Sequence, residues 1–391
     1  MSVLRVTSAL GFVQILAWGS TYYLLAILSG PIMADTGWSG TMVTGGISLG
    51  LLVAGLAAAR TGRVIHRYGG RHVMAAAMGL LAGGLALMAV SPSLPVYLAA
   101  WAVLGLGMGA GLYDAAFSSL GQVYGAGARR AITQLTLWGG FASTVCWPLS
   151  ALLVEGIGWR GTCLVYAGLH IAVSLPLCLI ALPKVAVGTL HPAPPAALAK
   201  APAGPVFWLL DIEGMVLSLI STIVSVHLIV LLQAQGVPLA AAVALGALIG
   251  PAQVGARMIE MATGGRHPAI WTLLTATALI AAGVAGMQAS LPMAAALIVY
   301  GAGNGLWSIA RGAVPLALFG ADRYPLATGR LAQPALLSAA IAPSLGAVLI
   351  DWLGTDQTFV FLAAASLVPL CCSLALLGVV RRGRAAQDFP A

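Results

Sequence analysis

The feature that most constrains the fold is a succession of apolar stretches separated by short turns rich in Pro, Gly and basic residues. A stretch of about 20 apolar residues crosses a bilayer as a helix, since a helix bonds all its backbone polar groups internally. The expected spans are residues 8–33, 40–60, 72–91, 95–118, 131–154, 161–182, 207–233, 239–262, 268–289, 292–318, 331–350 and 358–380. The sequence therefore predicts an all-α membrane protein with 12 transmembrane helices.

The composition excludes several other classes of protein. Only 7% of the 391 residues are charged, against about 25% in soluble domains. The net charge of +8 does not indicate a nucleic-acid partner, because the basic residues lie in short loops and form no aromatic-basic face. The five cysteines lie in apolar spans without metal-ligand spacing, so we expect packing residues, no metal and no cofactor. The first apolar run is too long for a cleavable signal peptide.

The positions of Lys and Arg predict the orientation, because cytoplasmic loops carry an excess of these residues. With the N-terminus in the cytoplasm, all but three of the 18 basic residues lie on the cytoplasmic side. Arg160 then lies outside, and Arg257 and Arg311 lie within spans. We therefore expect both termini in the cytoplasm, in the cytoplasmic (inner) membrane of a bacterium.

The two halves of the chain resemble each other. Gly-Gly-Arg-His occurs at 69–72 and again at 264–267, and the glycine-rich segment 107–113 of span 4 matches 301–307 of span 10. Pro148 likewise matches Pro343. These matches predict two pseudo-symmetric six-helix bundles, an arrangement typical of transporters with a substrate site between the halves. The expected domains are 1–182 and 207–384, with a Pro/Ala-rich linker at 183–206 and a C-terminal tail at 385–391.

The stretch 245–262 carries three polar residues in an otherwise apolar helix: Gln253, Arg257 and Glu260. They are spaced i, i+4 and i+7 and so form one stripe. A charge at membrane depth costs at least about 2.5 kcal/mol and normally faces a cavity or a partner. Arg257 is therefore a candidate anion-binding residue. The alternatives are a structural pair with Glu260 and snorkelling of Arg257 to the inner surface.

The loop after span 2 carries a recognisable motif. It contains Gly62, His66, Arg67, Gly69 and Arg71 in a pattern that resembles the G-x-x-x-D-R-x-G-R-R signature of the major facilitator superfamily (MFS). The resemblance covers essentially the whole chain and implies the MFS fold, with this loop as a gating element. His66 replaces the usual acid of the motif.

Span 4 departs from a second MFS pattern. The arginine of R-x-x-x-G-x-G, which is tied to proton coupling in many drug antiporters, is Trp101 here. The antiporter pattern of span 5 is also not met. Both departures weaken the hypothesis of drug efflux.

The second half resembles the monocarboxylate transporter and oxalate/formate antiporter branch. Members of that branch carry a substrate-binding Arg in span 8 with Asp or Asn four residues earlier, and Gln253 and Arg257 are similar to that pair. The resemblance also implies a histidine in span 7 and a substrate-facing tyrosine in span 4, for which His227 and Tyr113 are the matches. It implies small carboxylates as substrates, although Gln253 replaces the acid beside the Arg.

Further polar stripes supply the remaining candidate site residues. Those of the second half share one face of span 10, and those of the first half lie on span 1. Arg311 has the alternative role of an anchor at the cytoplasmic end of its helix. The candidates are Asn304, Trp307 and Arg311 in span 10 and Gln14, Trp18 and Tyr22 in span 1.

Three titratable residues are candidates for proton coupling: His227, Asp114 and Glu260. His227 has an unperturbed pKa near neutrality, but span 7 places most of its hydroxyl residues on the opposite face, so a structural core histidine is equally compatible. Asp114 has the alternative of pairing with Arg129 or Arg130.

Together these features predict a secondary transporter of a small organic anion that works by alternating access, by proton-coupled uptake or anion exchange. We expect a monomer in the lipid bilayer, driven by a proton or counter-anion gradient. The alternatives are a proton-driven efflux pump for amphiphilic compounds and, more remotely, a non-transporting membrane sensor. No nucleophile–base pair is visible at useful spacing, so we expect no enzymatic activity.

Overall fold

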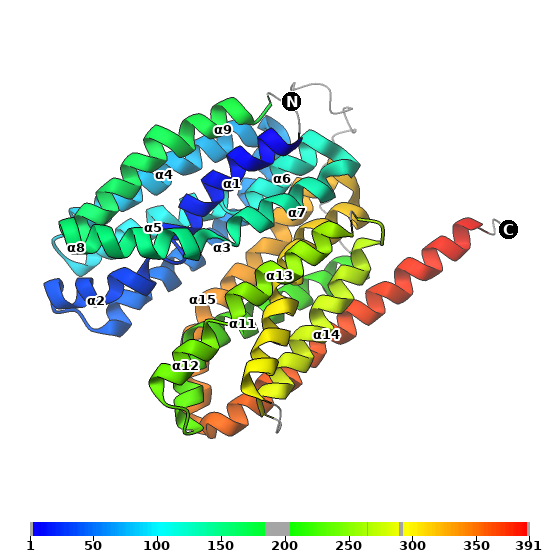
Figure 1. Ribbon diagram of the computed structural model, residues 1–391. Coiled ribbons are helices and arrows are strands. Elements are labelled where there is room, and N and C mark those ends of the chain that lie inside the picture. The colour runs from blue at the N-terminus through cyan, green and yellow to red at the C-terminus, as the bar shows by residue number, and fades with distance from the viewer. Residues whose placement is uncertain (1–2, 184–203, 264, 289–291, 389–391) are drawn as a thin grey trace. The chain divides into compact units, whose positions relative to one another are not determined.

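The computed structural model describes residues 3–183, 204–263, 265–288 and 292–388, and these residues form helices and turns. The helices are α1 Val3–Gly19, α2 Leu25–Thr36, α3 Gly40–Tyr68, α4 Gly70–Ala89, α5 Leu94–Gly111, α6 Tyr113–Tyr124, α7 Ala128–Gly139, α8 Ala142–Leu169, α9 Leu175–Ala181, α11 Pro205–Ala234, α12 Leu239–Gly246, α13 Ile249–Ala262, α14 Ala269–Gln288 and α15 Met293–Asp388 (Figure 1). Most of the expected linker, part of the expected tail and Gly264 of the repeated motif lie outside the described residues.

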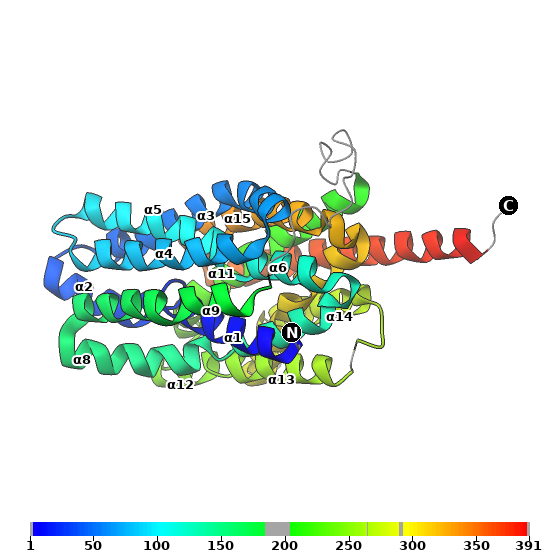
Figure 2. The same cartoon turned by 90° about the horizontal axis from the view of Figure 1, so that it is seen from above.

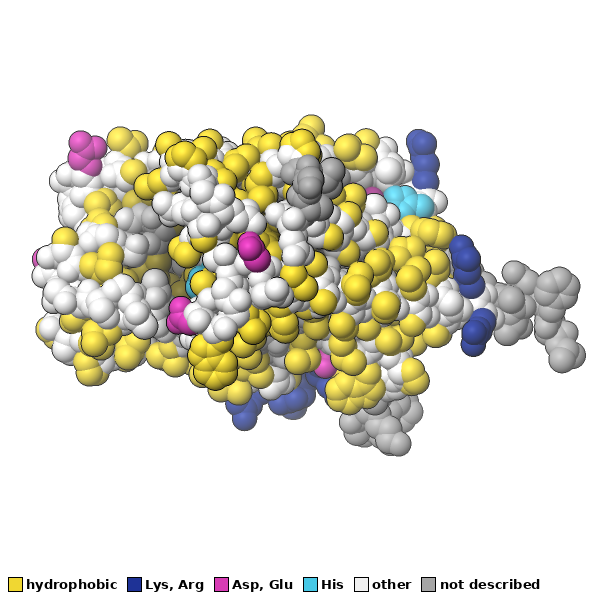
Figure 3. Space-filling view, turned by 90° about the horizontal axis from the view of Figure 1, so that it is seen from below, with side chains coloured by type: hydrophobic (Ala, Val, Ile, Leu, Met, Phe, Trp, Pro, Cys, Tyr) yellow, Lys and Arg dark blue, Asp and Glu magenta, His cyan; other side chains and the backbone are white. Residues whose placement is uncertain are grey.

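The surface of the protein is suited to lipid. Within the described ranges, eight helices are long and apolar enough to cross a membrane. Large apolar side chains point outward on them; Leu152 is 69% exposed and Ile180 is 72% exposed. Figure 3 shows a face composed mainly of hydrophobic and other uncharged groups, with few charged ones. These properties are those of an integral membrane protein.

Three breaks within the longest helices account for three of the four expected spans that are missing from the count of eight; the fourth is span 1, which is divided into the shorter helices α1 and α2. A straight helix as long as α15 would extend about 140 Å, far beyond the bilayer. Gly320 and Gly354 within α15 have φ values of 74° and 79°, and Gly158 within α8 has φ 70° and ψ 174°. These glycines fall between the expected spans 10 and 11, 11 and 12, and 5 and 6. The count of twelve remains a prediction.

Several expected spans are interrupted, among them spans 1, 4, 5, 6 and 8. Span 1 is divided into α1 and α2 by a turn at residues 20–24, where the Thr21 hydroxyl donates to the Ala17 carbonyl at 2.5 Å. Such back-bonding bends helices. Span 4 is divided into α5 and α6 at Leu112, whose backbone is extended (φ −82°, ψ −165°). The interruption leaves a carbonyl of the last turn of α5 available to another helix.

The chain forms two compact units, which do not follow the midpoint of the sequence. The first comprises residues 1–201 and 319–340, and the second comprises 202–318 and 341–391. In the first unit, α5 packs against α3 and α4, and α1 packs against α7 and α8 (Figures 1 and 2). The segment 319–340 joins this unit by packing on α3.

Glycines allow the helices of the first unit to approach closely. On α5, Gly105 and Gly109 face α3, and Gly107 faces α4. A Cβ at Gly109 would lie 2.9 Å from the backbone oxygen of Ala54 in α3. Close approach of this kind is the usual function of small residues between membrane helices.

The second unit repeats this packing. In α15, Gly301 and Gly305 face α13, and Gly303 faces α14. The order of faces matches the first unit only if Gly107 corresponds to Gly303. Matching glycines by the helix that each contacts therefore pairs residues two positions away from those paired by the alignment of segments 107–113 and 301–307. The contacts decide the pairing, because similar glycine-rich sequences can be aligned in more than one way.

Candidate functional site

Arg257 lies on α13 and is 6% exposed. Its Nε donates to the Ser308 hydroxyl at 3.0 Å and to the Gly305 carbonyl at 3.4 Å, both on α15. A terminal nitrogen donates to Gln253 Oε1 at 3.3 Å. These three acceptors are neutral oxygens, and they orient the guanidinium.

The close packing of α13 on α15 positions this group. A Cβ at Gly305 would lie 2.5 Å from the Gln253 carbonyl oxygen and 2.8 Å from its Cα. The two helices therefore meet backbone to backbone at the site. The Ser308 hydroxyl donates to the Gly305 carbonyl at 2.6 Å, which directs its lone pairs toward Arg257. Ser308 was not predicted as a site residue, although it shares the face of Asn304 and Arg311.

The other candidates on α15 lie on the same helix face. The Arg311 guanidinium lies over the Trp307 ring, 5.6 Å from its centroid. Asn304 accepts a hydrogen bond from the Ser221 hydroxyl of α11 at 3.1 Å. Thus Asn304 connects this stretch to α11, and Arg311 makes a cation–π contact.

His227 has a structural partner. Its Nε2 lies 2.9 Å from the carbonyl oxygen of Pro343, and only a protonated Nε2 can donate there. Gly346 provides the space for the ring, since a Cβ at that position would lie 2.5 Å from the imidazole. These contacts are those of a histidine that fastens α11 to α15. Its role in coupling remains a prediction.

Glu260 is bound at the end of α13 nearest α14. Its Oε1 accepts from the Thr272 hydroxyl at 2.9 Å, and its Oε2 lies 3.3 Å from Nε2 of His267. The contacts described for Glu260 thus go to the start of α14 and the turn before it. Those described for Arg257 go to α15 and to Gln253 on its own helix.

The candidates of span 1 form an aromatic cluster in the first unit. Gln14 is fully buried and donates to the Gly111 carbonyl at 2.7 Å, where the chain is interrupted at Leu112. Its Oε1 accepts from the Trp18 indole at 3.1 Å. The Trp18 ring lies 5.5 Å from Tyr22 and 5.1 Å from Tyr113. The structure thus brings together the four candidates of the first half.

Tyr113 begins α6, where its ring stacks on Phe117 at 5.1 Å and its hydroxyl donates to the Thr136 carbonyl at 3.3 Å. Asp114 follows in the first turn of α6. A negative charge there is favoured by the helix dipole. This placement agrees with a structural function of Asp114.

The motif that was expected to form a loop lies mainly at the end of α3 and the start of α4, and three of its residues have described backbone contacts. Gly69 joins α3 to α4 with φ 81°, a conformation that favours glycine, and its N–H bonds to the Ile65 carbonyl at 2.8 Å. Gly62 packs against segment 319–340, where a Cβ would collide with the Pro325 carbonyl oxygen. The His66 carbonyl accepts from the Gln122 amide at 3.3 Å.

The two arginines of the motif, one in α3 and one in α4, differ in their surroundings. The Arg67 guanidinium lies 5.1 Å from the ring centroid of Tyr68. The Nε of Arg71 is buried without a hydrogen-bond partner among the described residues.

Two further polar groups of the first unit were not predicted. His170, which is fully buried at the start of the π-helical turn His170–Ser174, lies with Nε2 2.8 Å from the Ser20 hydroxyl. The only signal in the sequence was a histidine in one apolar span and a serine in another. Such a pairing is decided by helix packing, and π-helical turns are frequent at functional sites.

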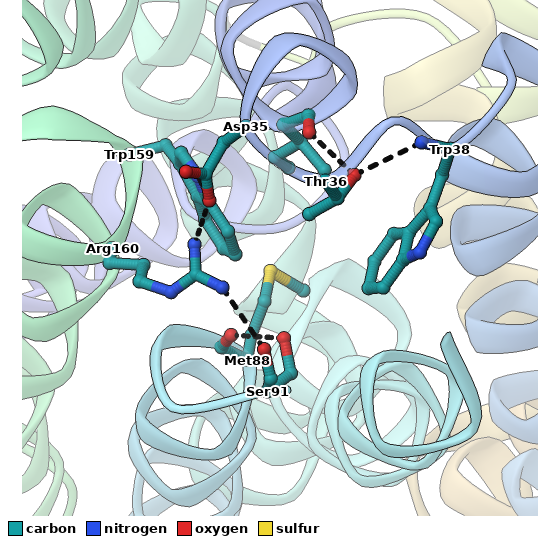
Figure 4. A network of polar contacts seen from close by, with 8 residues as sticks. Asp35, Thr36, Trp38, Met88, Ser91, Trp159 and Arg160 are labelled. Atoms are coloured by element: carbon teal, nitrogen blue, oxygen red, sulfur yellow. Dashed lines mark hydrogen bonds and ion pairs between the residues drawn. The ribbon is translucent and has the colours of Figure 1, made fainter. Parts of the chain in front are cut away.

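The second is an ion pair at one end of the first unit (Figure 4). Arg160 pairs with Asp35 and donates to the Ser91 carbonyl at 3.1 Å, and the Trp159 indole donates to Asp35 at 3.1 Å. The hydrogen bonds from Trp159 and Arg160 lower the pKa of Asp35 below its usual value. The pair gives a structural role to Arg160, the one loop arginine that the predicted orientation places outside.

Comparison with known families decides the class of protein. The family model of the Major Facilitator Superfamily matches residues 10–260, more than half of the chain. The chain belongs to the Major Facilitator Superfamily. Members of this superfamily are transporters, so the prediction of an MFS transporter is confirmed at this level. No curated protein matches the chain significantly.

Solved MFS structures share the fold at low sequence identity. The human organic anion transporter MFSD10 (TETRAN) is 16% identical with a TM-score of 0.74, over 95% of this chain and 100% of that one. An outward-conformation structure of the transporter FucP is 11% identical with a TM-score of 0.76, over 96% and 99%. The proton:xylose symporter XylE is 11% identical with a TM-score of 0.72, over 96% and 95%.

Proposed function

We propose that this MFS protein transports a small organic anion, a mono- or dicarboxylate, and that Arg257 binds its carboxylate. The observation that carries the proposal is a guanidinium 6% exposed within an apolar helix and oriented by neutral oxygens of Ser308, Gly305 and Gln253. The planar fork of an arginine matches a carboxylate in two parallel hydrogen bonds. Arg311 adds a second positive charge in the same unit.

The transport cycle that we propose is alternating access. The contact of Gly62 with Pro325 and Gly329 ties segment 319–340 to α3, and we propose that this contact opens and closes during the cycle. The driving force is a proton gradient or exchange for a counter-anion. We propose a monomer in the inner membrane of a bacterium, with both termini in the cytoplasm.

The experiment is uptake into proteoliposomes of radiolabelled formate, lactate, oxalate and succinate under imposed pH gradients. We expect the wild type to accumulate at least one anion, Arg257→Ala to lose uptake and Arg257→Lys to retain a small part. Arg266→Ala is the matched control, because it removes an exposed charge close by in sequence. Absence of anion uptake in the wild type, or undiminished uptake by Arg257→Ala, would overturn the proposal.

A second candidate function has one specific observation in its favour. Trp18, Tyr22, Tyr23, Tyr113 and Trp147 form a continuous aromatic cluster, with Tyr23 and Trp147 6.1 Å apart. Such a surface suits amphiphilic cations and drugs as well as metabolites. Export of ethidium from the same proteoliposomes, unchanged in Arg257→Ala, would favour the efflux pump over the anion transporter.

A further inference from the structure

The second unit contains a carboxyl group that the proposed anion site does not use. Glu213 is the ninth residue of α11, about 12 Å along the helix from its start. Its side chain is 2% exposed, and its Oε1 has no hydrogen-bond partner among the described residues. A polar atom buried in this way is costly and calls for an explanation.

The surroundings of Glu213 are almost without titratable groups. The next residues on its helix face, Leu217, Ile220 and Val224, are at most 1% exposed. α12 and α14 contain no Asp, Glu, Lys, Arg or His, and the stretch 358–376 offers only Cys371 and Cys372. The Cys372 thiol lies near enough to interact electrostatically with Glu213.

Several charged groups of the unit have contacts of their own. Asp211, two residues earlier on α11, is 7% exposed and has interactions of its own. Arg311 contacts Trp307, and Arg257 contacts Ser308. The structure therefore describes no cation beside Glu213. An ionised carboxylate without a countercharge is far more costly to bury than the neutral acid.

We infer that Glu213 binds the proton that drives transport: it is protonated in this buried conformation and releases the proton when the cycle hydrates it. The inference deepens the proposed function and rests on it for the coupling step. Two of the three predicted coupling candidates are held in place, since Glu260 is bonded to Thr272 and His267, and His227 to Pro343. Glu213 has the freedom to exchange a proton without breaking such contacts.

A test that requires no substrate is infrared spectroscopy of the purified full chain at neutral pH. We expect the carbonyl-stretch band of a protonated carboxyl in the wild type and its loss in Glu213→Gln. Glu155→Gln, which changes an exposed carboxyl, is the control and should keep the band. A band absent from the wild type, or retained in Glu213→Gln, would overturn the inference. Melting of Glu213→Gln at the wild-type temperature shows that the variant is folded and that no ion pair was lost.

The coupling step is tested with the anion that the wild type accumulates. Glu213→Gln should lose accumulation driven by the pH gradient and retain exchange of internal for external anion, because the binding site is intact. Accumulation retained by Glu213→Gln would reject Glu213 as the coupling group. If the wild type transports none of the four anions, the proposed function fails, and the infrared result still decides on its own whether Glu213 holds a proton. Failure of the anion site is therefore distinguishable from failure of the inference about Glu213.

Discussion

The two units pack their glycine-rich helices in the same way but place different chemistry beside them. In the first, α5 meets α3 and α4, and the adjoining polar residue is Gln14, surrounded by aromatic rings. In the second, the corresponding stretch of α15 meets α13 and α14, and the adjoining residue is Arg257. The two units thus share their backbone packing but differ in the side chain beside it, which is a neutral amide in the first unit and a guanidinium in the second.

The largest effects should come from filling the glycine contacts. Gly305→Ala places a methyl group 2.5 Å from the backbone oxygen of Gln253, whereas in Gly109→Ala the nearest atom, in Ala54, is 2.9 Å away. Neither backbone is free to yield. We expect destabilisation of about 3 kcal/mol or more, at the upper end of the range for overpacking, with Gly305→Ala the more severe, measured by thermal unfolding in detergent.

The controls for this comparison are Gly255→Ala and Gly83→Ala, because a Cβ at either position meets nothing within 4 Å. Both should unfold at or slightly above the wild-type temperature, since alanine favours a helix. Wild-type stability of Gly305→Ala would show that the two helices are farther apart than described.

Intermediate effects should follow from removing the polar residue beside each glycine contact. Gln14→Leu leaves the buried Gly111 carbonyl and the Trp18 indole without their partner, at a cost of about 1–3 kcal/mol. Ser308→Ala removes one of the acceptors of Arg257, and we expect about 1 kcal/mol. Chemical denaturation in mixed micelles gives both values, with the exposed Gln233→Leu as control. If Ser308→Ala loses more free energy of unfolding than Gln14→Leu, the polar contact beside the glycines would matter more in the second unit than in the first, contrary to this expectation.

The smallest effect concerns the ion pair of the first unit. Because the pKa of Asp35 is lowered by Trp159 and Arg160, the carboxylate stabilises the fold above its unfolded pKa of about 3.9. That stabilisation is lost as the pH falls through the lower, folded pKa. Asp35→Asn should therefore unfold below the wild-type temperature at pH 7, and the two should converge in acid. A difference that is as large in acid as at pH 7 would contradict this account.

The sequence predicted the superfamily and the candidate groups better than it predicted their contacts. Arg257 and Gln253 were found because a charge in an apolar helix is conspicuous, and their spacing places them on one face. Ser20 with His170, and Asp35 with Arg160, were not found as pairs, because each joins residues more than 100 positions apart. The sequence alignment of the glycine repeats was wrong by two residues, because glycine-rich segments can be aligned at several offsets and only the helix contacts decide between them.

The sequence by itself determined that this chain is helical and lies in a membrane, because apolar length and the positions of breakers need no knowledge of packing. The superfamily was predicted from the resemblance of its motif residues. The tertiary structure decided which buried groups have partners. Glu213 and Glu260 look alike in the sequence, both acids near the end of an apolar helix. Only the packing shows that Glu260 accepts a hydrogen bond from Thr272, whereas Oε1 of Glu213 is buried without a hydrogen-bond partner among the described residues. That difference depends on which helix lies opposite, and a linear pattern does not contain it.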